Sequence, residues 1–201
     1  RGRRRLHRKA HAEIHRRLMA AKLPLAVDLD GTLIKTDLFT RAMLRFCSAA
    51  PWNGFVLLAW LTRGRAYAKQ HLTRLDPVDA TALPYNAPLI AWLREERAAG
   101  RIIALATAFD QGGADAVAAH LGLFDHIFAS DGRTNLKSAK KADRLRRAFP
   151  GGFVYAGNER ADLKVWATAK AAVIVNASPA LVREAARRFE VERVFPRDEH
   201  A

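Results

Sequence analysis

Cysteine is almost absent from this sequence, because Cys47 is the single cysteine among 201 residues. One cysteine excludes an intrachain disulfide and any cluster of thiolate ligands around a metal ion. Long apolar runs are absent as well. The longest one, residues 55–61, is far shorter than the roughly 18 residues that a membrane-spanning helix needs. We therefore expect a soluble, cytoplasmic domain in which Cys47 is a buried structural side chain.

Acidic residues are scarce compared with basic ones, with 20 Asp/Glu against 34 Lys/Arg and a net charge of +14. Residues 1–22 alone hold nine Lys/Arg and one acid, so they carry +8 and leave +6 for the other 179 residues. The basicity is mainly a property of this N-terminal arm. We expect the arm to be solvated and to touch phosphates or anionic lipid at the inner face of the bacterial membrane. Nucleic acid is disfavoured as a partner, because the arm has no interleaved aromatic residues for base stacking.

From residue 23 onward, short apolar runs alternate with helical stretches. This alternation is typical of a parallel sheet whose two faces are covered by helices. The expected strands are residues 23–27, 101–106, 126–129, 153–156 and 172–176, with 191–195 as a weaker sixth. The expected helices between them are residues 87–99, 113–121, 137–149, 161–170 and 179–189. The sequence thus predicts an α/β fold with a Rossmann-like, doubly wound parallel sheet.

One segment, residues 37–83, interrupts the alternation. It contains helical stretches at 37–49, 52–62 and 65–75, separated by Pro51, Gly64 and Pro77, and no strand-like run. We interpret it as a small helical cap over the carboxyl ends of the strands. The predicted domains are an arm at 1–22, a core at 23–36 and 84–201, and a cap at 37–83. We expect the large aromatic residues of the cap to form its own core, namely Trp52, Phe55, Trp60 and Tyr67.

Two carboxylates two residues apart, Asp28 and Asp30, follow the first predicted strand. At a strand end that enters a loop, this spacing lets both side chains face one pocket. Asp28 is then a candidate nucleophile that attacks phosphorus and forms an aspartyl-phosphate. Asp30 is a candidate acid that protonates the leaving oxygen and later takes a proton from the attacking water. Gly31 gives the backbone room to turn, so that the amides after it, at Thr32 above all, can hold phosphate oxygens.

Further polar residues follow the later strands. Thr107 can donate its hydroxyl to a phosphate oxygen, with Ala108 beside it, and Lys137 can neutralise both the nucleophile and the phosphate. Oxygens of Asn158 and Asp162, together with Asp28 and the Asp30 carbonyl, suit Mg²⁺, which prefers oxygen ligands. Each signal is weak alone, but all of them in this order, each after a strand, predict a magnesium-dependent phosphoryl-transfer site.

These motifs resemble those of the haloacid-dehalogenase-like (HAD) superfamily over residues 23 to about 182. The family's four motifs correspond to Asp28/Asp30, Thr107, Lys137 and Asn158/Asp162, and the helical insertion is similar to a C1-type cap. The resemblance implies a phosphatase rather than a dehalogenase or an ion-pumping ATPase, because those lack the second acid found here as Asp30. The stretch 157–176 resembles the phosphoserine-phosphatase branch of the superfamily.

A narrower likeness comes from strings such as VDLDGTLIKTD, LPYN, ASDG-x-TNLK and YAGN-x-x-ADL-x-VW. They resemble HAD domains that are fused to membrane prenyltransferases of the UbiA type. This resemblance implies a polyprenyl-linked or sugar phosphate as substrate and a membrane prenyltransferase domain after Ala201. One residue departs from the family pattern, since most members have Asp where this chain has Asn158. The neutral amide keeps an oxygen ligand but removes one negative charge, so we expect weaker Mg²⁺ binding.

Three functions remain open from the sequence. The first is a phosphatase for a small or lipid-linked phosphomonoester. The second is a catalytically weak domain that binds or regulates an attached membrane prenyltransferase, which the amide at Asn158 favours and the complete set of other motifs opposes. The third is a polynucleotide phosphatase guided by the basic arm, which the lack of stacking residues in that arm opposes.

Overall fold

A six-stranded parallel sheet forms the centre of the molecule in the computed structural model, which describes residues 22–197. The strand order is β3-β2-β1-β4-β5-β6, so the first strand lies in the middle. The strands are β1 (Leu25–Val27), β2 (Ile103–Asp110), β3 (His126–Ser130), β4 (Val154–Gly157), β5 (Ala171–Val175) and β6 (Val191–Phe195). The α/β fold with a doubly wound parallel sheet, predicted from the alternating pattern, is confirmed.

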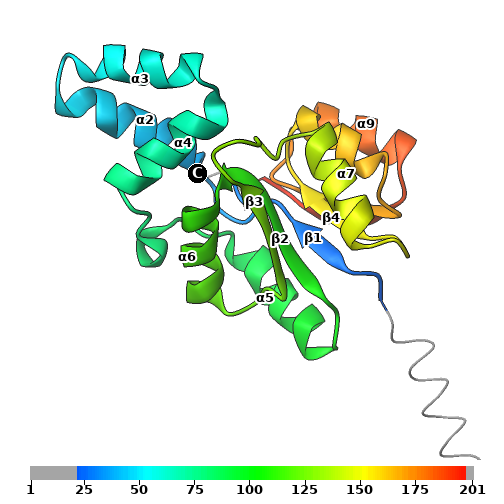
Figure 1. The fold of residues 1–201 in the computed structure, drawn as a ribbon. Coiled ribbons are helices and arrows are strands. Elements are labelled where there is room, and N and C mark those ends of the chain that lie inside the picture. Colours follow the sequence, from blue (N-terminus) through cyan, green and yellow to red (C-terminus); the bar gives the residue numbers. More distant parts are fainter. Residues whose placement is uncertain (1–21, 198–201) are drawn as a thin grey trace, which may run out of the picture.

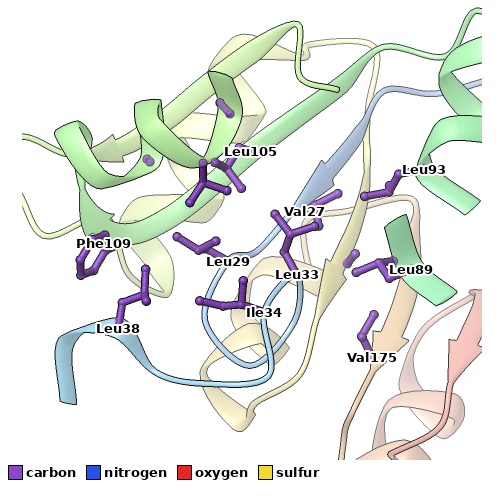
Figure 2. Close-up of a cluster of buried hydrophobic side chains, with 14 of the residues drawn as sticks. Val27, Leu29, Leu33, Ile34, Leu38, Leu89, Leu93, Leu105, Phe109 and Val175 are labelled. Atoms are coloured by element: carbon purple, nitrogen blue, oxygen red, sulfur yellow. The ribbon is translucent and has the colours of Figure 1, made fainter. Parts of the chain in front are cut away.

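Helices cover both faces of the sheet, and each face has its own apolar cluster (Figure 1). One face is packed by α5 (Ala87–Ala98) and α6 (Gln111–Leu121), and the other by α7 (Ala139–Ala148), α8 (Leu163–Trp166) and α9 (Pro179–Arg188). Central strands sandwiched in this way must be apolar on both sides. The whole of β1 is accordingly buried, with residues of alternating orientation entering the two clusters. Figure 2 shows part of the first cluster, in which Val27, Leu105 and Val175 from three strands lie together with Leu89 and Leu93 of α5.

Several predicted elements differ from the structure in extent. The strand expected over 101–106 is β2, Ile103–Asp110, so Thr107 and Ala108 lie within the strand and not after it. The helix expected over 161–170 is a short 3-10 turn, η2 (Arg160–Asp162), followed by α8, because at Lys170 the backbone already bonds to Phe153 as the chain enters β5. The helix expected over 137–149 begins two residues late, at Ala139. Its start is delayed because Ser138 has a φ of 56°, which is incompatible with a right-handed helix. Lys137 consequently precedes the helix instead of opening it.

The cap consists of α2 (Leu38–Ala49), α3 (Asn53–Thr62), α4 (Arg65–Leu75) and a 3-10 turn, η1 (Ala80–Ala82). It joins the core through two segments that run side by side. Ile34 forms bridges to both Asp30 and Tyr85, and the Lys35 amide donates to the Pro84 carbonyl over 2.9 Å. The apolar interior of the cap is continuous with the first cluster of the core through Leu57 and Leu72, among others.

The expected aromatic core of the cap is only half correct. Trp60 stacks on Phe46 with ring centroids 5.1 Å apart, and Tyr67 stacks on a histidine of its own helix, His71. Trp52 and Phe55, in contrast, are 67% and 79% exposed. The reason is the helical period. The inward face of α3 carries Leu57, and a residue two positions away on a helix points to the opposite side.

The predicted N-terminal arm lies outside the described residues except for Lys22. The Lys22 ammonium donates to the Glu96 carboxylate over 2.7 Å, at the amino end of the sheet. Within residues 22–197, none of the helices has the length and apolar character that crossing a membrane requires. Cys47 is partly buried and packs against the first apolar cluster, close to the interior position that was expected for it.

Candidate active site

The carboxyl ends of β1, β2 and β4, which are neighbours at the centre of the sheet, border a cavity of about 200 Å³. The cap closes its other side. Charged residues dominate the lining. The acids are Asp28, Asp30, Asp37, Glu159 and Asp162. The cations are Lys35, Arg65, Lys69, Lys137 and Lys141. Ligands of parallel α/β sheets gather at this edge, so the cavity is the candidate site.

Asp28 is 7% exposed and lies at the bottom of this arrangement. Its Oδ1 accepts a hydrogen bond from the Leu29 amide at 2.9 Å and another from the Lys141 ammonium at 2.8 Å. Lys141 also donates to the hydroxyl of Tyr155, which in turn donates to Asp162 Oδ1 at 2.9 Å. A continuous buried chain of polar groups thus links the two carboxylates. Burial, with the negative charges of Asp162 and Asp28, raises the pKa of Tyr155 well above its usual range, so its hydroxyl stays protonated as a donor.

The lysine that contacts Asp28 is Lys141, whereas the sequence had pointed to Lys137. The Lys137 ammonium lies at the pocket wall, half-exposed, and pairs with the Glu159 carboxylate at 2.9 Å. Its hydrogen bond to Glu159 raises its pKa. Lys141 was missed although a signal existed. It lies within the helix expected over 137–149, and an apolar helix face that contains a lysine invites a search for the buried partner of that lysine.

Asp30 is partly buried and accepts a hydrogen bond from the Leu38 amide, at the start of α2, over 2.9 Å. The loop that carries the two acids is therefore tied directly to the cap. Burial raises the pKa of Asp30 to about 7, and the charge of Asp28 adds to the effect. A carboxyl group with such a pKa can both give and take a proton near neutral pH. The two acids that are two residues apart are thus placed in different electrostatic environments.

Some of the other predicted phosphate-binding residues line the cavity beside Asp28 and Asp30, and others are buried behind its wall. Gly31 lines the cavity with a φ of 74°, and a side chain there would collide with Asn158. Thr32 is buried, and its hydroxyl donates to Asn158 Oδ1 at 3.2 Å. Thr107 is fully buried, and its Oγ1 accepts from the Phe109 amide at 2.9 Å. Thr107 does not line the cavity, whereas its neighbour on β2, Ala108, does.

Asp162 lies beneath the loop after β4 and is 3% exposed. Its Oδ2 accepts from the amides of Asn158 and Glu159 at 2.9 and 3.0 Å, which holds the loop against the site. Burial, together with the nearby charge of Asp28, raises the pKa of Asp162 to about 6. Two buried carboxylates that disfavour each other's charge are relieved by a cation between them.

The donor set fits a hard divalent cation such as Mg²⁺. Asp28, Asn158 and Asp162 all border the same cavity, and each has a side-chain oxygen atom of the kind that Mg²⁺ binds. Within the described residues, no three Asp, Glu, His or Cys side chains cluster closely enough to hold a metal by themselves. A metal held here would therefore need further oxygen ligands, such as the amide oxygen of Asn158 and the backbone carbonyl predicted for Asp30.

The cap supplies the outer wall of the cavity through α2 and α4. Lys69 of α4 is 7% exposed, donates to the Ala108 carbonyl over 2.6 Å, and lies over the ring of Phe39. Burial lowers the pKa of Lys69. Arg65, one turn earlier on α4, reaches the same wall. These two cap cations were not predicted from the sequence, because helical spacing shows that they share a face but not that this face meets the sheet.

No model of a known protein family matches the chain. A curated protein of Sinorhizobium fredii, described as the uncharacterized protein y4nM, is 41% identical over 154 residues. The match covers 77% of this chain and 30% of that protein, so the chain spans less than a third of the length of this relative.

Solved structures of HAD-family proteins share the fold. A HAD family hydrolase, t0658, from Salmonella enterica serovar Typhi superposes with a TM-score of 0.61 at 15% identity, covering 87% of this chain and 69% of that one. A phosphoserine phosphatase in its apo form superposes with a TM-score of 0.60 at 16% identity, covering 88% and 95% of the two chains. The fold of this chain is therefore the one found in HAD-family hydrolases, phosphoserine phosphatase among them.

Proposed function

We propose that the chain is a magnesium-dependent phosphomonoester hydrolase that works through an aspartyl-phosphate on Asp28. The observation that carries the proposal is the pair Asp28 and Asp30. Asp28 is charge-paired with Lys141 at 2.8 Å, while burial raises the pKa of Asp30 to about 7, and both border one cavity rich in cations. A nucleophile and a proton donor two residues apart are what this reaction requires.

In the first half-reaction, Asp28 attacks phosphorus. Both of the hydrogen bonds that it accepts go to Oδ1, which leaves Oδ2 for the attack. The bond from phosphorus to the leaving oxygen breaks as Asp30 transfers its proton to that oxygen. Lys141 holds the nucleophile in place, and the cations around the cavity attract the negative phosphate. Mg²⁺, held by Asp28, Asn158, Asp162 and the Asp30 carbonyl, would offset charge on the transferring group.

In the second half-reaction, Asp30 is a carboxylate and takes a proton from water. The water oxygen attacks phosphorus, the bond to Asp28 breaks, and phosphate leaves with both acids restored. The fold shared with phosphoserine phosphatase supports the covalent step on Asp28, since one structure of that enzyme carries an analogue of a phospho-aspartyl intermediate.

The test is the release of phosphate from a generic aryl phosphate with and without Mg²⁺. We expect Asp28→Asn to abolish release, and the same substitution at exposed Asp143 to leave it unchanged. Release by Asp28→Asn at the rate of the unaltered chain would contradict the mechanism. Failure of the folded, unaltered chain to hydrolyse any of a broad panel of phosphate esters would favour the alternative of a binding or regulatory domain.

We propose further that the cap is of the C1 type, within the phosphoserine-phosphatase branch, and that the substrate is a polyprenyl-linked or sugar phosphate. The insertion of the cap between β1 and β2 supports the first point. The likeness to HAD domains fused to UbiA-type prenyltransferases supports the second, and the greater length of the curated relative is consistent with such a fusion. A native reading frame that continues past Ala201 into apolar spans is the expected finding. A frame without them would remove the support for a fused membrane partner.

A further inference from the structure

Helix α3 is the outermost element of the cap and packs on α2 and α4 beneath it (Figure 1). It contains no charged residue over its ten positions, Asn53–Thr62. A surface helix of a soluble protein normally has a polar outer face. This helix is apolar on both its inner and its outer side.

The exposed side of α3 forms a continuous apolar stripe. Phe55 is 79% exposed and Leu58 is 61% exposed, and Trp52 precedes Phe55 by three residues with 67% of its surface exposed. Positions three and four apart on a helix share a face, so these side chains line up along the outside of the cap. Large apolar side chains that gather on a surface in this way mark an interaction site.

Exposed basic residues occur on the same cap. Arg63 follows α3 directly, and the exposed face of α2 carries Arg41 and Arg45 around Leu44, which is itself 62% exposed. Arg45 also pairs with the Asp76 carboxylate at 3.3 Å. Over the whole cap, residues 37–83, six Lys/Arg stand against three Asp/Glu. The surface therefore combines exposed aromatic and aliphatic groups with positive charge.

We propose that this cap surface, defined by Leu44, Trp52, Phe55, Leu58 and the exposed cap arginines Arg41, Arg45 and Arg63, docks onto an anionic lipid bilayer. Apolar side chains on one side of a helix enter the boundary between headgroups and acyl chains, and arginines beside them bind lipid phosphates. A second copy of the chain fits less well, because the same surface on both copies would bring their arginines together.

The docking surface and the catalytic cavity use different residues of the cap. The cavity is lined by Phe39 of α2 and by Arg65 and Lys69 of α4, and neither α3 nor Leu44 and its two neighbouring arginines on α2 belong to this lining. Contact between the docking surface and a bilayer therefore does not involve the cavity wall. Docking is independent of whether the chain hydrolyses phosphate esters, so it is tested by binding alone.

The experiment measures partition of the full chain into vesicles of phosphatidylcholine with and without phosphatidylglycerol. We expect Phe55→Ser/Leu58→Ser to weaken partition into the anionic vesicles by about tenfold or more, since each side chain loses its apolar burial. The matched control is Ile102→Ser/Val194→Ser, which removes two apolar side chains that are each 43% exposed and lie outside the cap. The control should bind like the unaltered chain.

The charge contribution is tested on the same full chain. Residues 1–22 add nine Lys/Arg, so the decisive quantity is the difference between variants that share this arm. We expect Arg41→Gln/Arg45→Gln to weaken partition into anionic vesicles by about tenfold, and Arg146→Gln/Arg147→Gln on α7 to weaken it much less. A blue shift of tryptophan fluorescence on binding, lost in Trp52→Phe, would place the stripe in the bilayer.

Equal partition of the stripe variant and its control would overturn the proposal. So would a stripe variant that changes only the sedimentation of the lipid-free chain, since the stripe would then be a contact between copies. A partner protein bound in the absence of lipid and released by the same substitutions would contradict docking onto a bilayer as well.

Discussion

The sheet edge and the cap differ in the kinds of side chain that they bury and expose. At the sheet edge, charges are buried and matched, as in the pair of Asp28 with Lys141 and the two backbone amides that donate to Asp162. On the cap, apolar side chains are exposed, and cations such as Arg65 face the cavity from its rim. Charged groups that are held in place by buried partners suit catalysis. Cations at the cavity rim and exposed apolar side chains suit the binding of substrate or of a partner. We therefore expect changes at the sheet edge to act on kcat, and changes in the cap to act on KM or on binding.

The largest effect expected from a group that does not itself react concerns Lys141. Lys141→Ala should lower kcat by about a hundredfold or more, because the nucleophile loses its only buried cationic partner among the described residues. Lys137→Ala should lower kcat by about tenfold or less, because its ammonium is half-exposed and paired with Glu159. The exposed neighbour Lys140 supplies a control. Steady-state kinetics on folded variants decide the order, and a larger loss from Lys137→Ala would reverse the assignment.

A pH-dependent effect on stability is expected from Asp30. Its pKa rises from 3.8 in the unfolded chain to about 7 in the native protein. Between these values Asp30 binds more protons in the native state than in the unfolded state. Its contribution to stability is therefore greatest below about pH 4 and is lost progressively as the pH rises to about 7. Asp30→Asn should remove this pH-dependent loss, which amounts to about 2 kcal/mol in the free energy of unfolding once the partial exposure of Asp30 is allowed for. Urea unfolding of both proteins in the presence of a chelator, at several pH values, measures the difference. A difference that does not change with pH would show that the pKa of Asp30 is not raised.

A smaller effect is expected from the metal ligand that departs from the family pattern. Asn158→Asp restores one negative charge beside Asp28 and should tighten Mg²⁺ binding by about tenfold. Titration calorimetry of the folded chain measures the affinity directly, without turnover. Glu159→Gln, at the neighbouring half-exposed position, serves as a control for charge in general. Unchanged affinity in Asn158→Asp would mean that this side chain does not touch the metal.

The smallest effect is expected from the cap. Arg65→Ala should raise KM by about threefold to tenfold and leave kcat nearly unchanged, because the guanidinium attracts substrate without touching the reacting atoms. Arg74→Ala, exposed on the same helix outside the cavity lining, is the control. A fall in kcat with constant KM in Arg65→Ala would place this cap residue in the chemistry and erase the contrast with the sheet edge.

The sequence predicts the sheet edge better than the cap, and the reason is geometric. Asp28 and Asn158 directly follow β1 and β4, and Ala108 lies near the carboxyl end of β2. Parallel strands bring their carboxyl ends together whatever the rest of the chain does. Positions that depend on tertiary packing were not predictable in this way. Lys141 contacts Asp28 from a helix that begins only after Ser138, whose φ of 56° no sequence pattern predicts. Phe55 is exposed because the inward face of α3 carries Leu57.

The most direct test concerns the covalent state of Asp28. The folded chain is mixed with Mg²⁺ and an aryl phosphate, quenched in acid during turnover, and digested for mass analysis of the peptide that carries Asp28 and Asp30. We predict a phosphoryl group on Asp28, absent from Asp28→Asn and retained in Asp143→Asn. Sustained phosphate release without any phosphorylated peptide, or a phosphoryl group on another residue, would contradict Asp28 as the nucleophile.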